Sequence, residues 1–112
     1  MIYTASFLKD IVSREDRVQP SLILETPFTK EIRIVFKKGQ EMKEHMAPYP
    51  IVVQVFKGKI DFGVSEKRYE LAEGDLISLD GKVKHDLIAL EDSIVRLTIS
   101  KQDTIERVEA IH

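Results

Sequence analysis

The sequence predicts an all-β protein built as a sandwich or barrel, and three observations lead to this prediction. Short apolar runs recur along the 112 residues at spacings of roughly 8–10 residues. Glycine or other turn residues separate these runs, as at Gly58 and Gly74. The intervals are too short for the dozen or more residues that a crossover between parallel strands requires. We therefore expect about eight or nine strands in one domain over residues 1–112, with its core at about 20–100.

The N-terminal part of the chain predicts one helical segment and one edge strand. Four apolar residues between Phe7 and Val12 recur at helical spacing, which predicts a short N-terminal helix. Pro20 opens the next apolar run, and Pro27 must end it or confine it to a sheet edge.

The remaining strands follow from alternation and from turns. In residues 31–36, Ile32, Ile34 and Phe36 alternate with Glu31, Arg33 and Val35, which predicts a half-buried strand. Residues 51–56 are almost wholly apolar, and the later apolar runs predict strands at 60–64, 68–71, 76–79, 85–90 and 94–99. After Ser100, the segment Asp103-Thr-Ile-Glu106 resembles a capping box and predicts a terminal helical turn.

Composition excludes several functions. The chain has 17 basic and 19 acidic residues, a net charge of −2, so no basic field attracts nucleic acid or an anionic membrane. It has no cysteine, which excludes disulfides, thiolate zinc sites and a thiol nucleophile. The N-terminus lacks a basic signal region, and no apolar run is long enough to span a bilayer. We expect a cytoplasmic protein.

Two phrases dominate the middle of the chain, residues 39–45 and residues 74–85. Each begins with a glycine and delivers one histidine, His45 or His85. They resemble the paired motifs of the cupins, a family of small jelly-roll barrels that typically hold a metal in the barrel mouth. The positions that fall in register are Gly39, His45 and Gly58 in the first motif, and Gly74 and His85 in the second.

The chain also departs from the cupin motifs. Ala47 stands at the second histidine of the first motif, and Ile51 stands at its glutamate. In the second motif, Asp80, Lys82 and Ala89 replace the proline, glycine and asparagine. The resemblance implies a site of three histidines and one carboxylate, of which this chain keeps two histidines. Since catalytic zinc or iron sites need about three protein ligands, we expect no metal cofactor.

Three interpretations of the histidine pair remain open. The two imidazoles either line an apolar cavity as satisfied polar groups, or anchor a small apolar or amphipathic ligand, or hold a divalent transition metal in a dioxygenase- or isomerase-type enzyme. We favour a non-catalytic, metal-free binding protein. The expected ligand-binding residues are His45, Ala47, Ile51, Val53, Val55, His85, Leu87 and Ala89, with Met42 and Met46 near the mouth.

The alternation also predicts an apolar outer face on one sheet. Large apolar faces usually mark interfaces, and arginine and aromatic residues often anchor them. We therefore expect a homodimer that packs sheet to sheet, as the family resemblance also implies. The expected interface residues are Arg33, Val35, Val52, Gln54, Phe56, Ile94, Arg96 and Thr98. The alternative is that helices from the two ends of the same chain cover this face.

Overall fold

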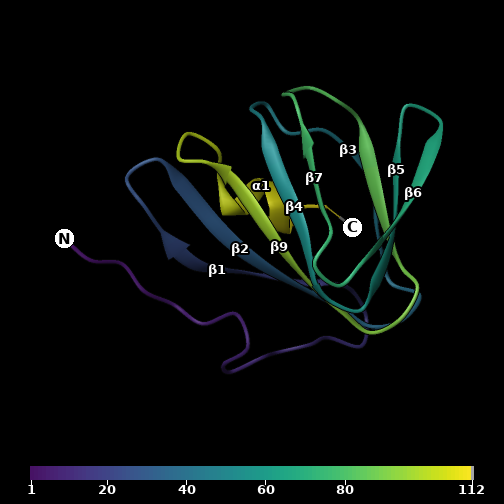
Figure 1. The fold of residues 1–112 in the computed structure, drawn as a ribbon, viewed down its shortest axis with the longest axis horizontal. Coiled ribbons are helices and arrows are strands. Elements are labelled where there is room, and N and C mark those ends of the chain that lie inside the picture. Colours follow the sequence, from purple (N-terminus) through teal and green to yellow (C-terminus); the bar gives the residue numbers. More distant parts are fainter. Residues whose placement is uncertain (112) are drawn as a thin grey trace.

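A computed structural model describes residues 1–111 and consists of two antiparallel sheets packed face to face (Figure 1). The five-stranded sheet has the order β1-β2-β9-β4-β7, and the four-stranded sheet has the order β3-β8-β5-β6. The strands are β1 (Gln19–Glu25), β2 (Thr29–Phe36), β3 (Glu41–His45), β4 (Ile51–Lys57), β5 (Lys59–Val64), β6 (Lys67–Ala72), β7 (Leu76–Leu79), β8 (His85–Ala89) and β9 (Ser93–Ser100). This is the predicted all-β jelly roll.

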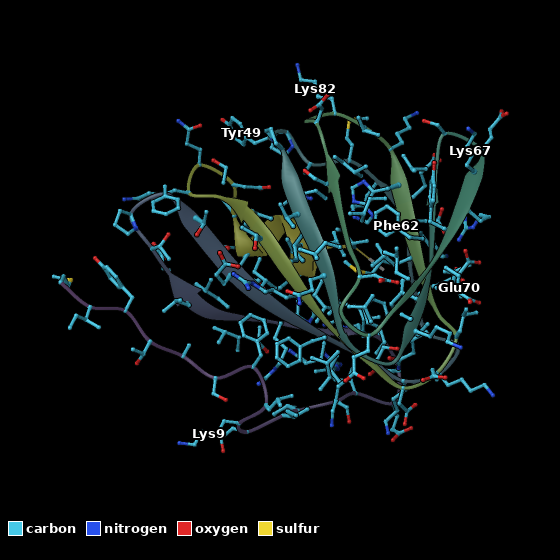
Figure 2. All side chains as sticks on the ribbon, viewed as in Figure 1. Lys9, Tyr49, Phe62, Lys67, Glu70 and Lys82 are labelled. Atoms are coloured by element: carbon cyan, nitrogen blue, oxygen red, sulfur yellow. The ribbon has the colours of Figure 1, made fainter. Side chains whose placement is uncertain are left out.

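Alternation along the strands places one contiguous apolar core between the two sheets. Ile32 and Val95 from the five-stranded sheet and Ile60 and Phe62 from the four-stranded sheet are fully buried. Figure 2 shows Phe62 lying within the body of the molecule. At roughly 25 cal/mol per Å² of buried apolar area, this core is the main stabilising contribution to the fold.

One short helix, α1 (Ile105–Glu109), completes the described part of the chain. Thr104 is its N-cap and accepts a hydrogen bond from the amide of Arg107, so the helix begins one residue later than the predicted capping box. Asp103 is instead buried, and its carboxylate accepts hydrogen bonds from Nε and Nη2 of Arg107, each at 2.7 Å. The pair closes the first turn of the helix, and the helix packs against β1 with Val108 inserted into the core. No helix in residues 1–111 is long and apolar enough to cross a membrane.

The predicted N-terminal helix is wrong. Residues 1–14, which we call the strap, contain bends but no helix, and follow the outside of the five-stranded sheet (Figure 1). One of these apolar residues packs on the sheet without forming a helix: Phe7 stacks on Phe56 of β4, with ring centroids 6.0 Å apart. Leu8, Ile11 and Val12 remain 43–56% exposed, so no apolar stripe is buried as a helix would require.

The strap also changes the environment of β2. We predicted a half-buried strand, but all residues from Glu31 to Phe36 are buried. The inner face packs in the core, and the strap covers part of the outer face. The alternation correctly predicted which β2 side chains face the core, but the outer side chains do not face open solvent.

Candidate functional site

The two cupin-like phrases bring their histidines together. His45 at the end of β3 pairs in register with His85 at the start of β8. Their ring centroids are 4.2 Å apart at an interplanar angle of 62°, and the His85 ring stacks on Phe62 at 5.6 Å. Phe62 was not among the predicted site residues. Its place in an apolar strand indicated burial, but not contact with a histidine three strands later in the sequence.

Hydrogen bonds to the backbone fix the tautomer of each imidazole. Nδ1 of His45 lies 2.6 Å from the carbonyl oxygen of Lys43, and Nδ1 of His85 lies 2.9 Å from that of Val83. A carbonyl oxygen only accepts, so each Nδ1 must carry the proton. In the neutral state, each Nε2 is therefore left as a lone-pair acceptor or metal ligand.

Burial keeps both rings neutral. It lowers the pKa of His45 from 6.5 to about 4, although the carbonyl of Lys43 opposes the shift, and the neighbouring His85 and the Arg107 guanidinium lower it further. Burial also lowers the pKa of His85, with Val83 opposing the shift and Arg107 adding to it. At neutral pH the site therefore presents two uncharged imidazoles.

The surrounding donors do not complete a metal site. No group of three or more histidine, aspartate or glutamate side chains within residues 1–111 is arranged to hold a metal ion. Ala47 and Ile51 are buried in the core and carry no donor atom. Asp86 follows His85, but its carboxylate accepts two hydrogen bonds from Arg68. The residues present do not fit the centre of three histidines and one carboxylate that the family resemblance implies.

The residues predicted as apolar walls lie in the packed core between the sheets, to which the helix also contributes. Ala47, Ile51, Val53, Val55, Leu87, Ala89 and Met42 all belong to the buried core, whereas Met46 is 42% exposed. Val108 joins the same core, and Arg107 acts electrostatically on both histidines. The alignment of apolar positions in the terminal segment predicted a helix, but nothing in the sequence indicated which end of the barrel it would reach.

The strap covers part of the predicted dimer interface. Arg33 is only 4% exposed, and its guanidinium donates to the carbonyl oxygens of Lys9 at 2.7 Å, Asp10 at 3.1 Å and, weakly, Phe7 at 3.4 Å. The Nε atom of Arg33 is buried and has no hydrogen-bond partner within the described chain. Val35 and Ile94 are also buried, at 7% and 8% exposure.

A buried carboxylate organises the adjoining part of this face. Glu31 accepts hydrogen bonds from Nε of Arg96 at 3.0 Å, from Thr29 at 2.9 Å and from the hydroxyl of Thr98. Burial alone would raise the pKa of Glu31, but these hydrogen bonds outweigh it, so the pKa lies below its usual value. Glu31 and Arg96 thus form an ion pair across β2 and β9.

A hollow remains open beside this cluster. Its volume is about 230 Å³, and it is lined by Val52, Gln54, Leu76, Arg96 and Thr98. Leu76 is 62% exposed and was not among the predicted interface residues, because its strand was not placed beside β4 in the sequence analysis.

The chain is similar to known proteins in both sequence and fold. Residues 32–100 match the Cupin_2 family, described as a cupin domain. None of the curated proteins matches the chain. A solved RmlC-like cupin from Desulfovibrio desulfuricans has a TM-score of 0.80 and 20% identity, with 89% of this chain and 97% of that chain covered.

Two further solved structures give the same result. A conserved protein of unknown function from Streptococcus pyogenes has a TM-score of 0.75 and 20% identity, covering 90% of this chain and 89% of that one. KdgF from Halomonas sp. has a TM-score of 0.70 and 22% identity, with 79% and 82% covered. At these identities the likeness concerns the fold alone.

Proposed function

The chain belongs to the Cupin_2 family, and we propose that it is a non-catalytic member that binds a small apolar or amphipathic molecule in the barrel mouth without a metal. One observation carries this proposal: two neutral imidazoles, His45 and His85, face an apolar interior with no third donor group within residues 1–111. Ligand pockets typically combine such apolar walls with a few placed polar groups.

The tautomers define the hydrogen bonding of the guest. Both Nε2 atoms accept, so a complementary guest supplies an O–H or N–H group near the histidine pair. Its apolar part then contacts the surrounding aliphatic side chains. Each Å² of apolar surface removed from water contributes roughly 25 cal/mol.

A second candidate is a metal-dependent enzyme of the dioxygenase or isomerase type. Neutral imidazoles with unpaired Nε2 atoms are the state in which histidine binds transition metals, and the two rings are neighbours. Water or a substrate atom would have to supply the remaining ligands.

Metal analysis and thermal melts distinguish the two candidates. Purified protein is assayed for metal, then melted with added zinc, iron, nickel or copper, because a ligand that binds only the folded state raises the melting temperature. His45→Ala and His85→Ala test the site, and His112→Ala is the matched control because it is the third histidine of the chain. A stoichiometric metal that is lost in the first two variants alone would overturn the metal-free proposal.

Native mass spectrometry tests ligand binding directly. A small molecule that is retained by the wild type and by His112→Ala, but lost on His85→Ala, supports the binding proposal. A protein that carries nothing from cells and shows no melting shift across a panel of small alcohols, phenols and amides contradicts it.

We also propose that the chain forms a two-fold homodimer through the outer face of the five-stranded sheet. The open hollow around Val52, Gln54, Arg96 and Thr98 supplies the contact centre, with Leu76 as an exposed apolar anchor. The strap lies over the part of the face that holds the other predicted interface residues, so we propose no direct contact with the second copy for Arg33, Val35, Phe56 and Ile94. Leu76→Glu is expected to give monomers in analytical ultracentrifugation, with Lys82→Glu as the surface control. A dimer that survives Leu76→Glu would move the interface to another face.

A further inference from the structure

A separate cavity of about 360 Å³ lies on the outer face of the five-stranded sheet, away from the histidine pair. Its floor is a cross-strand row, because Val35 of β2 pairs with Ile94 of β9, which in turn pairs with Lys57 of β4. Thr98, in the hollow described above, lies four residues along β9 from Ile94, or roughly 13 Å. The cavity is therefore distinct from both the barrel mouth and the proposed dimer centre.

A β-bulge brings Lys57 to this row. The register between β4 and β9 shifts between Val55 and Lys57, so Phe56 is the extra residue. In a regular strand, the side chains of Phe56 and Lys57 would point to opposite faces of the sheet. Because of the bulge, both side chains lie on the outer face. Phe56 stacks under Phe7 of the strap, and Lys57 lines the cavity.

The strap forms one wall of the cavity and is fixed on both sides of it. On one side, Arg33 holds the carbonyl groups of Lys9 and Asp10. On the other side, the side-chain amide of Gln40 donates a hydrogen bond to the carbonyl oxygen of Arg14 at 2.8 Å. Ile11 and Ser13, which line the cavity, lie between these attachments. The wall is thus a span of chain held at two points over an apolar floor.

The charges of the lining favour an anion beside Lys57. Lys37 forms an ion pair with Glu15 at 3.3 Å, and Asp92 accepts a hydrogen bond from the amide of Lys38 at 2.8 Å. Within the described residues, the ammonium of Lys57 has neither an ion pair nor a hydrogen bond. Of the two lysines that line the cavity, Lys57 is therefore the one whose charge is left to bind a guest.

We infer that this cavity is a second small-molecule site, which takes an apolar monocarboxylate. The carboxylate pairs with Lys57, and the apolar body lies on Val35 and Ile94 under Ile11 of the strap. The guest removes apolar floor from water and neutralises the unpaired cation, two effects that act together only for an amphipathic anion. This inference does not depend on the proposed function of the histidine pair.

Octanoate is a suitable probe, with octanol and octylamine as matched compounds of other charge. Binding to the full-length protein is followed by methyl NMR, observing Val35 and Ile94 in the cavity and Val53 in the barrel. Lys57→Met removes the cation, and Lys38→Met is the control because Lys38 is exposed, nearby and outside the cavity lining. Ser13→Trp fills the cavity from the exposed strap without altering Lys57.

We expect octanoate to shift the methyl signals of Val35 and Ile94 and to bind about two- to fivefold more weakly to Lys57→Met than to Lys38→Met. Octanol should bind more weakly, octylamine should not bind, and Ser13→Trp should abolish the effect. Equal affinity in the two lysine variants would overturn the inference. Shifts at Val53 alone would place the probe in the barrel, and concentration-dependent shifts without probe would assign the cavity to a second copy; either result also overturns it.

Discussion

The pH dependence of stability should reveal the desolvated state of His45. Its pKa is about 4 in the folded protein and about 6.5 when exposed. As pH falls below about 6.5, the unfolded chain binds a proton that the folded protein resists. The free energy of unfolding therefore decreases from about pH 6.5 to about pH 4 and then this contribution levels off.

The shift of 6.5 − 4, or about 2.5 pKa units, corresponds to at most about 3 kcal/mol. Because the His45 ring keeps partial contact with water, we discount this to about 1–2 kcal/mol. His85 contributes in the same direction, since its pKa is also lowered. The carboxylate of Glu31, with its lowered pKa, loses its contribution only at still lower pH.

The assay is urea unfolding of metal-free protein, followed by circular dichroism from about pH 4 to about pH 7.5. His45→Gln should flatten the dependence by about 1–2 kcal/mol across this range, while His112→Gln should run parallel to the wild type. Groups that titrate in all variants contribute equally to each curve, so they cancel when the free energies of unfolding of two variants are subtracted. A wild-type curve parallel to that of His45→Gln, or an NMR titration of His45 with a midpoint near pH 6.5, would refute the reasoning.

Three further substitutions test individual contacts. Gly58→Ala should cost about 2–4 kcal/mol in urea unfolding, because Gly58 has φ +88° and an added Cβ would lie 2.2 Å from Oγ of Ser93; Gly39→Ala, with nothing near its Cβ, should cost less. Asp103→Ala should destabilise the protein by about 3 kcal/mol by leaving Arg107 without its buried partner, and an unchanged unfolding midpoint would contradict a stabilising role for this pair. Arg33→Met should release the strap and make it the first site of limited proteolysis, whereas a cleavage pattern equal to the wild type would show that other contacts hold it.

The fold was largely predictable because its information is local. Alternation along a strand sets which side chains face the core, and glycines mark where the chain turns. The prediction of an N-terminal helix was wrong because it also used local information alone. Spacing between Phe7 and Val12 fits a helix, but the conformation is decided by Arg33, which lies far along the chain and binds the carbonyls that a helix would use internally.

The site was predictable only in part, since contacts across the sheets decide it. The motif spacing indicated that His45 and His85 belong to one region, and their register pairing on β3 and β8 brings the rings together. The stacking of Phe62 and the approach of Arg107 depend on packing between elements. The bulge that delivers Lys57 depends on the register of β9 against β4, which the sequence of either strand alone does not define.

The replacements at Ala47 and Ile51 have a physical consequence beyond two missing ligands. A divalent ion beside the histidines would lie among buried apolar side chains, and the carboxylate of Asp86, which acts electrostatically on both rings, is already paired with Arg68. In the proposed binding mode, an uncharged guest would gain from burial of its apolar part and would pair one O–H or N–H group with an Nε2 atom. Arg107 adds to this selection, since its positive charge acts on both rings and would repel a cation held between them. Too few donors, an apolar wall and a nearby guanidinium together support the proposal of a metal-free site.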